Sequence, residues 1–262
     1  MPVGDEFKHL TKTRLGYLVN ALFGTADLHS HFRLKPVIGF IADYMEHHPH
    51  RKFIEVGCGI GLNLFEIAKL HNNFEYLGFD LDENSIRVAN ELLEDLELPQ
   101  QVRFINESAE RFDFANEKYP FNTVLLIDIL EHLNDPDALL RNLKAKITVD
   151  TIFVVSVPTY QYPRVIGRSF HEAVGHVRDG FNLTELERMF DKIGGTLEFH
   201  RYSTGFPAEL ACALYYRTLT SNRYINNLRT IVFSPFRFMD WFNNQKISCS
   251  LMAVFKVRRE GE

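Results

Sequence analysis

The chain has 262 residues, of which 45% are hydrophobic and 24% charged, a composition typical of a soluble globular protein. The 29 Lys and Arg residues against 34 Asp and Glu give a formal net charge of −5, and this balance argues against a dedicated nucleic-acid-binding protein, which usually carries a basic excess. The three cysteines (Cys58, Cys212 and Cys249) are widely spaced and include no CxxC pair. We therefore expect no disulfide framework and no zinc finger, and a reducing, cytoplasmic location.

The N-terminal region lacks the continuous apolar segment of a secretory signal. Apolar residues between Phe7 and Phe23 instead recur three or four positions apart, which predicts an amphipathic helix in a helical cover formed by residues 1–50. No run of about 18 apolar residues occurs anywhere, so we expect no integral membrane span.

Short apolar runs alternate with helical patterns through the middle of the chain. The expected elements are, in order, a strand at 52–56, a helix at 62–70, a strand at 74–80, a helix at 84–94, strands at 102–106 and 123–127, a helix at 136–144 and a strand at 151–157. This alternation predicts βαβ units, and therefore a doubly wound α/β fold whose parallel sheet is covered by helices on both faces.

The pattern changes after residue 157. Asn182 and Glu185 have the spacing of a capping box, which predicts the start of a helix over 182–193. Two further strands are expected at 197–202 and 250–257, with about 45 residues of helical composition between them. Such an insertion is typical of a lid or an oligomer contact.

The glycine-rich turn after the first strand carries the functional signal. Gly57, Gly59 and Gly61 follow strand 52–56, and bare backbone there can approach a ligand at the carboxyl ends of the strands. The second strand ends at Asp80, where a carboxylate can bind the two hydroxyls of a ribose. Together these features predict a site for a nucleoside cofactor.

The details of the turn favour S-adenosylmethionine over a dinucleotide. The spacing is G-x-G-x-G, and Leu62 stands where the dinucleotide fingerprint has its third glycine. Glu55, two residues before the first glycine, would repel a pyrophosphate but suits the cationic amino and sulfonium groups of S-adenosylmethionine.

Several segments resemble the class I S-adenosylmethionine-dependent methyltransferases. FIEVGCGIGLNLFEIA resembles their first motif and YLGFDLDENSI their second, and INESAERFDF, FNTVLLIDILEHLNDPDALLRNLK and TIFVVSVPT follow in the family's order. The segment order is most similar to the small-molecule and lipid-modifying branch. The resemblance implies a Rossmann-like, seven-stranded, mostly parallel sheet with an antiparallel last strand. It also implies one methyltransferase domain, divided into an N-terminal cover (1–50), a cofactor-binding core (51–202), a helical cap (203–248) and a final strand (249–257).

The resemblance also implies roles for individual residues. Glu55 would orient the amino end of the cofactor, and the turn formed by Gly57, Cys58, Gly59 and Gly61 would cradle it, with Cys58 itself expected to be a small buried filler. The remaining cofactor-binding candidates are Asp80 at the ribose, Leu81, Ser108 and Ala109 at the adenine, and Asp128 at the methionine part or the acceptor. Ser108 replaces the family's usual Asp, and Glu107 or Glu110 is available to substitute for it.

Methyl transfer requires mainly that an acceptor be aligned with the methyl group, with a general base where the acceptor must lose a proton. The candidate catalytic residues are His176, His132 and Asp128, with His171 as a further candidate base, and each of the first three also has a purely structural interpretation. His176, Arg178, Tyr160 and Phe181 are the candidate substrate-binding residues. No metal site is expected, because the histidines of Glu46-His47-His48-Pro49-His50 are typical of a solvated loop.

The late insertion is the best indication of the acceptor. Residues 206–242 contain nine aromatic residues, four Arg and two acids, a local net charge of +2. Three interpretations remain open: helices packed on the sheet with Arg on the wet face, a cap over an apolar or ring-bearing acceptor, and a homodimer or shallow membrane contact.

The sequence as a whole predicts a methyltransferase acting on an oxygen or nitrogen of a small molecule, with no nucleic-acid partner. Asp128-Ile129-Leu130-Glu131 replaces the Asn/Asp-Pro-Pro-aromatic sequence of nucleic-acid amino methyltransferases. The alternatives are a non-catalytic S-adenosylmethionine-binding protein and a nicotinamide-dependent oxidoreductase.

Overall fold

The structure is a computed structural model that describes residues 28–48, 52–70, 74–95, 101–114, 117, 120–168, 172, 175–218, 220, 222–240 and 243–259. Three of the predictions lie outside these residues: the helix expected between Phe7 and Phe23, the candidate base His171, and the aromatic pair Trp241 and Phe242.

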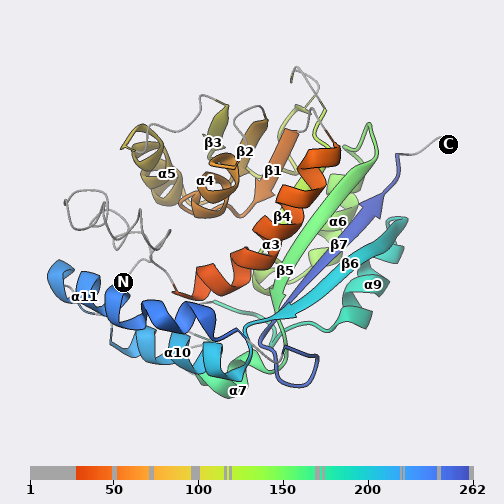
Figure 1. The fold of residues 1–262 in the computed structure, drawn as a ribbon. Coiled ribbons are helices and arrows are strands. Elements are labelled where there is room, and N and C mark those ends of the chain that lie inside the picture. The colour runs from red at the N-terminus through yellow and green to blue at the C-terminus, as the bar shows by residue number, and fades with distance from the viewer. Residues whose placement is uncertain are drawn as a thin grey trace.

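Seven strands form one sheet in the order β3-β2-β1-β4-β5-β7-β6 (Figure 1). The strands are β1 (Lys52–Val56), β2 (Glu75–Phe79), β3 (Val102–Ile105), β4 (Thr123–Ile127), β5 (Thr151–Pro158), β6 (Gly195–Ser203) and β7 (Ser250–Val257). Six strands are parallel, and β7 runs antiparallel to both of its neighbours, β5 and β6. The predicted mostly parallel sheet with an antiparallel last strand is therefore confirmed. The strand order reverses between β1 and β4, which is where open α/β sheets bind their ligands.

Helices cover both faces of the sheet (Figure 1). One face packs against α3 (Leu28–His47), α4 (Leu62–Ala68) and α5 (Glu83–Asp95), and the other against α6 (Pro136–Lys144) and α9 (Leu183–Asp191). Successive side chains of β1 point to opposite faces of the sheet. Phe53 packs in the apolar cluster that includes residues of α3, α4 and α5, and Ile54 packs in the cluster that includes residues of α6 and α9. Within the described part of the chain, no helix is both long and apolar enough to cross a membrane.

Helix α9 begins with the predicted capping box, and acidic side chains cap two further helices. Asn182 accepts a hydrogen bond from the Glu185 amide (3.0 Å), and the Glu185 carboxylate accepts one from the Asn182 amide (2.9 Å). Asp135 caps α6 by accepting from Ala138, with Pro136 in the first helical position. Asp82 is the residue that caps α5, accepting from the Ser85 amide at 3.1 Å.

The late insertion forms α10 (Phe206–Arg217), α11 (Arg223–Phe233) and the short helix η3 (Ser234–Phe238), and α10 packs against α3 and α7 (Tyr162–Ile166). Part of its aromatic content belongs to a small core, because Tyr215 is buried in one cluster with Phe32 of α3. Arg229 is also buried, with its guanidinium 4.0 Å from the centre of the Tyr215 ring. This finding differs from the interpretation that placed the arginines on the wet face.

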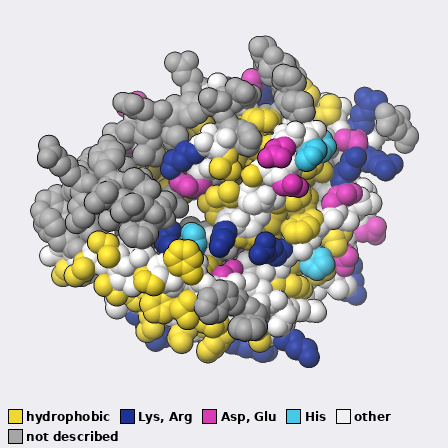
Figure 2. All heavy atoms as spheres, viewed as in Figure 1, with side chains coloured by type: hydrophobic (Ala, Val, Ile, Leu, Met, Phe, Trp, Pro, Cys, Tyr) yellow, Lys and Arg dark blue, Asp and Glu magenta, His cyan; other side chains and the backbone are white. Residues whose placement is uncertain are grey.

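The outer face of the insertion is aliphatic. Figure 2 shows hydrophobic side chains gathered over the part of the molecule where Figure 1 places α10 and α11. The large exposed apolar residues of these helices are Phe206, Leu210, Leu214, Ile225, Leu228, Ile231 and Val232. Contiguous apolar surface of this kind is typical of a contact with another molecule.

Candidate active site

The glycine turn and the end of β2 are joined by a direct hydrogen bond. The amide of Gly59 donates to Oδ2 of Asp80 at 2.8 Å, while Oδ1 of Asp80 accepts from the Asp82 amide at 2.9 Å. Gly59 has φ +54°, and no atom lies within 4 Å of the place where its Cβ would be. The backbone at Gly59 is therefore open on the side where a ligand would approach.

At position 61, both the backbone conformation and a neighbouring ring favour glycine. Its φ is +81°, and a Cβ there would lie 2.3 Å from Cζ of Phe104. Cys58 is buried, and burial raises the pKa of its thiol. The structure thus places Cys58 as a small packed side chain, as expected, and not as a reactive thiol.

Glu55 is a fully buried acid directly below the glycine turn. Its Oε1 accepts a hydrogen bond from Nδ2 of Asn63 at 2.6 Å, whereas its Oε2 has no hydrogen-bond partner in the described structure. Burial, with a smaller contribution from Asp80 and Asp128, raises the pKa of Glu55 to about 8. A buried acid with one free oxygen suits a cationic group of a ligand.

A cavity of about 350 Å³ opens beside the turn. Its lining includes Gly57, Asp80, Leu81, Ser108 and Ala109, five of the predicted cofactor-binding residues. Glu107 and Glu110 also line it, so both of the acids considered as substitutes for the missing Asp are in place. The volume is within the range of small-molecule sites.

A larger hollow of about 890 Å³ lies elsewhere, between α3 and the outer strands β6 and β7. None of its lining residues belongs to the glycine turn or to a residue that follows β1, β2 or β4. We assign the site to the smaller cavity, because ligands of open α/β sheets bind at the carboxyl ends of the strands.

Asp128, directly after β4, forms an ion pair with Arg33 of α3. Arg33 is only 3% exposed, and its guanidinium also lies 5.0 Å from the centre of the Tyr162 ring. Burial alone would lower the pKa of Arg33, but the facing Asp128 carboxylate outweighs it and keeps the guanidinium charged. Asp128 has φ +52°, an uncommon backbone conformation for a non-glycine residue that is often found at functional sites.

Two buried acids surround this ion pair. Burial and the Asp128 charge raise the pKa of Glu131, and burial raises that of Glu209 on α10 to about 7. Both acids are fully buried, and Arg33 is only 3% exposed. The late insertion therefore contributes a carboxyl group to the buried ionisable residues beside the site.

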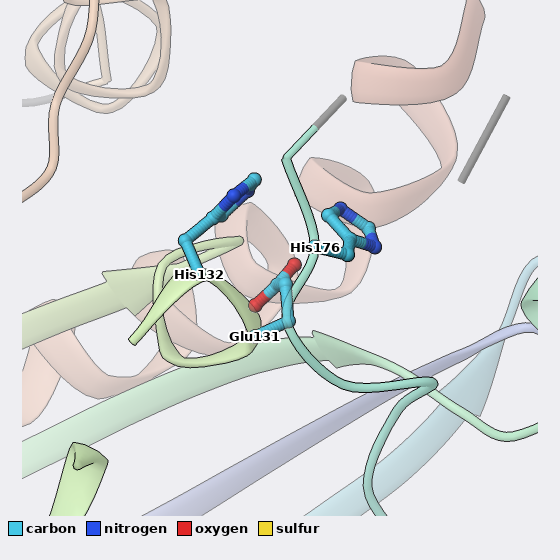
Figure 3. Close-up of side chains that lie close together, drawn as sticks. All are labelled: Glu131, His132 and His176. Atoms are coloured by element: carbon cyan, nitrogen blue, oxygen red, sulfur yellow. The ribbon is translucent and has the colours of Figure 1, made fainter. Parts of the chain in front are cut away.

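His132 and His176 lie together although 44 positions separate them. Their rings are 4.7 Å apart and nearly perpendicular, and Nδ1 of His132 lies 3.1 Å from the carbonyl oxygen of Gly175. Figure 3 shows the Glu131 carboxylate between the two imidazoles. Two of the predicted catalytic residues thus share one location next to the third, Asp128.

The candidate substrate-binding residues divide into two groups. Tyr160 is 40% exposed and donates a hydrogen bond to Glu185, and burial and this bond raise its pKa to about 12. Phe181 is 0% exposed and its ring packs in the core cluster, so its contact with the acceptor stays a prediction that this burial does not favour. Arg178 stacks over that ring at 4.7 Å.

The sequence did not indicate a role in the site for Arg33, Asn63, Glu131 or Glu209. Asn63 lies eight residues after Glu55 on the first turn of α4, a separation that predicts their contact once the strand and helix are assigned. Nothing in the local sequence pairs Arg33 with Asp128, because they meet only through the packing of α3 across the sheet.

A family model described as "Methyltransferase domain" matches residues 54–153. Among curated proteins, a ubiquinone biosynthesis O-methyltransferase of Idiomarina loihiensis is 30% identical over 110 residues, which are 42% of this chain and 43% of the relative. An uncharacterised protein of Synechococcus is 25% identical over 137 residues, which are 49% of this chain and 32% of that relative. The chain thus spans less than half the length of either relative.

Solved structures share the fold at low identity. The plantazolicin methyltransferase BpumL in complex with SAH superposes with a TM-score of 0.58 at 12% identity, covering 98% of this chain and 95% of that one. The [4+2]-cyclase SpnF superposes at 0.56 and 12% identity, covering 85% and 80%. The sequence motifs, the sheet order and the family match therefore agree that residues 54–153 are similar to a methyltransferase domain.

Proposed function

We propose that the protein is an S-adenosylmethionine-dependent methyltransferase that acts on an oxygen or nitrogen of a small, apolar or ring-containing acceptor. The observation that carries this proposal is the hydrogen bond from Gly59 to Asp80, a residue that lines the 350 Å³ cavity. This hydrogen bond holds the open backbone of Gly59 and the carboxylate of Asp80, at the end of β2, together as one surface that a ligand can contact.

The residues present fit the cofactor in charge and shape. Asp80 would bind the ribose hydroxyls, and the exposed side chain of Leu81 would cover the adenine, whose edge would meet Ser108 and the backbone of Ala109. The free Oε2 of Glu55 offers a buried acceptor for the amino group of the methionine end. When bound, S-adenosylmethionine supplies a methyl group already activated on a sulfonium.

The protein's own part in the reaction is to position the acceptor and to remove its proton. His132 and His176 are the proposed bases, because both are half-buried and lie beside the turn that follows β4. Asp128 is held by Arg33 and would orient the methionine part or the acceptor. Tyr160 and Arg178 are the remaining proposed contacts for the acceptor.

Two alternatives use the same site. The first alternative is a protein that binds the cofactor without transferring its methyl group, because one fold can serve different functions and this fold is shared with a protein named as a [4+2]-cyclase. A nicotinamide-dependent oxidoreductase is disfavoured, because α4 begins at Leu62 where a dinucleotide site has glycine.

Calorimetric titration with S-adenosylmethionine and with NAD distinguishes an S-adenosylmethionine-binding protein from a nicotinamide-dependent oxidoreductase. We expect micromolar or tighter binding of the first and none of the second, and the reverse pattern would overturn the proposal. Incubation of cell extracts with isotope-labelled S-adenosylmethionine, followed by mass spectrometry, then distinguishes an enzyme from a binding protein, because only an enzyme yields a labelled methylated product.

We further propose a homodimer contact through residues 206–242, supported by the exposed apolar side chains of α10 and α11. Light scattering on the wild type and on Leu228→Asp tests it, since Leu228 is 60% exposed and its replacement should leave the fold intact. A wild-type monomer would contradict the contact. The three buried free thiols support a reducing location such as the cytoplasm.

A further inference from the structure

Glu131, His132 and His176 form a cluster with the composition of a metal site. One potential ligand atom from each residue lies within 4.8 Å of the others. Figure 3 shows that Glu131 and His132 come from the short helix η2 (Leu130–His132) and His176 from a separate segment of chain. Ligands from two parts of the fold meet here, so tertiary structure and not local sequence creates the cluster.

The backbone holds the two segments together independently of the three side chains. The amide of Val177 donates to the carbonyl oxygen of Glu131 at 2.9 Å, and the amide of Phe181 donates to that of Pro158 at 2.9 Å. The segment that carries His176 is thus fixed at both ends, against η2 and against the end of β5. A preformed arrangement of this kind lowers the entropic cost of binding an ion.

His132 is oriented as a metal ligand is. The carbonyl oxygen of Gly175 can only accept a hydrogen bond, so Nδ1 of His132 must carry the proton that it donates across 3.1 Å. The neutral ring then has its lone pair on Nε2. A backbone carbonyl that fixes the tautomer of a histidine is the usual outer support of a metal-binding imidazole.

Glu131 provides a second and independent observation. Its side chain is 0% exposed, and neither carboxylate oxygen has a hydrogen-bond partner in the described structure. Arg33, the buried cation nearby, is ion-paired with Asp128. A buried carboxyl group without partners is costly, and it is directed between two imidazoles that a cation could bridge to it.

We propose that Glu131, His132 and His176 bind a divalent first-row transition metal ion of the zinc type. Two imidazoles and one carboxylate suit Zn²⁺ or Co²⁺, whereas Mg²⁺ and Ca²⁺ prefer oxygen ligands. Three protein ligands leave at least one coordination position for water or for an oxygen or nitrogen of another molecule. This site replaces the expectation from sequence that no metal is bound.

The position of the ion suggests what it would do. Ile129 and Leu133, on either side of η2, line the 350 Å³ cavity, and Asp128 precedes them. Under the proposed function, the ion would hold the acceptor atom and lower its pKa, and it would take the place of a histidine base because His132 and His176, as its ligands, could not accept a proton. This favours acceptors bearing a hydroxyl group. Binding of the ion itself does not depend on methyl transfer.

Cobalt binding to tag-free protein tests the site. After treatment with a chelator, the full chain is titrated with CoCl₂, read by its visible absorption, and with ZnCl₂, read by calorimetry. We expect one equivalent to bind, with the spectrum of nitrogen and oxygen ligands and without a thiolate band. His132→Ala and His176→Ala should each weaken binding by about tenfold or more.

The matched control is His200→Ala, which removes an exposed histidine of β6 and should bind cobalt like the wild type. Absence of binding, a thiolate spectrum, or equal affinity of wild type, His132→Ala and His176→Ala would each overturn the proposal. Both histidines are half-buried, so these variants test the site even where Glu131→Gln does not fold. A parallel titration with S-adenosylmethionine keeps the two proposals apart, because cofactor binding without cobalt binding rejects only the metal site.

Discussion

The amide of Gly59 donates a hydrogen bond to the carboxylate of Asp80 across 2.8 Å, and this bond connects the turn after β1 to the end of β2. Two segments that are 21 residues apart thereby become one surface. The other oxygen of Asp80 is held by the Asp82 amide, so the carboxylate is fixed before any ligand arrives. Preorganisation of this kind increases affinity because less side-chain freedom is lost on binding.

Replacing Asp80 by alanine should weaken the binding of S-adenosylmethionine by about tenfold or more, because both ribose hydrogen bonds are charge-assisted. Calorimetry on folded protein measures this change, with Asp191→Ala at the exposed end of α9 as the control. Unchanged affinity in Asp80→Ala would refute the assignment of the ribose site.

Gly61→Ala should destabilise the protein by about 2 kcal/mol or more, because φ is +81° and the new Cβ would meet the Phe104 ring. Gly39 in α3 has no atom within 4 Å of its Cβ position, so Gly39→Ala should instead stabilise by about 0.5–1 kcal/mol. Urea denaturation of the two variants measures this contrast. A Gly61→Ala protein as stable as wild type would show that the turn can rearrange.

The pKa of Glu55 is raised to about 8 from a usual value of 4.5. The folded protein thus binds this proton more tightly than the unfolded chain, and the associated stability is present below pH 4.5 and is lost as the pH rises through 8. Glu55→Gln should therefore stabilise the cofactor-free protein at pH 8.5, on the order of 2 kcal/mol, and have little effect at pH 4.5. Thermal unfolding at the two pH values measures the difference.

The same variant should bind S-adenosylmethionine more weakly, and more so at pH 8.5 than at pH 6. A cationic amino group favours ionised Glu55, so wild-type binding should release a proton below pH 8. Calorimetry in buffers of different ionisation enthalpy detects this release. Identical enthalpies in all buffers would argue against contact between Glu55 and the amino group.

Arg33→Ala should destabilise the protein by about 1–3 kcal/mol, because it leaves the partly buried Asp128 without its ionic partner. Arg87, which pairs with Glu91 on the exposed surface of α5, is the matched control, and Arg87→Ala should cost about 0.5 kcal/mol or less. Chemical denaturation gives both values. Similar losses in the two variants would mean that the buried pair contributes little.

Structural features that depend on residues adjacent in the sequence could be predicted. The capping box of Asn182 and Glu185, the Pro136 start of α6 and the positive φ angles of the glycine turn all follow from a few adjacent positions. Asp80 could be placed in the site because the carboxyl ends of neighbouring parallel strands meet at one edge of the sheet.

The parts that depend on packing could not be predicted. Arg33 meets Asp128, and Glu131 meets His176, only after α3 and the segment before α9 have docked on the sheet. Phe181 follows a histidine-arginine pattern that resembles a substrate contact, yet its ring is enclosed by the core. The rings of the late insertion likewise divide between a small core and the surface according to which face of each helix packs inward.

The position of β7 determines when the protein can complete its fold during synthesis. β7 is the last of the seven strands along the chain, and β6 has no other hydrogen-bonded neighbour in the sheet. A ribosome-bound chain that has produced α10 and α11 therefore still lacks the strand that attaches β6. Until β7 emerges, β6 has no strand to pair with and the edge of β5 is open, and unpaired strand edges of this kind make a nascent protein prone to aggregation.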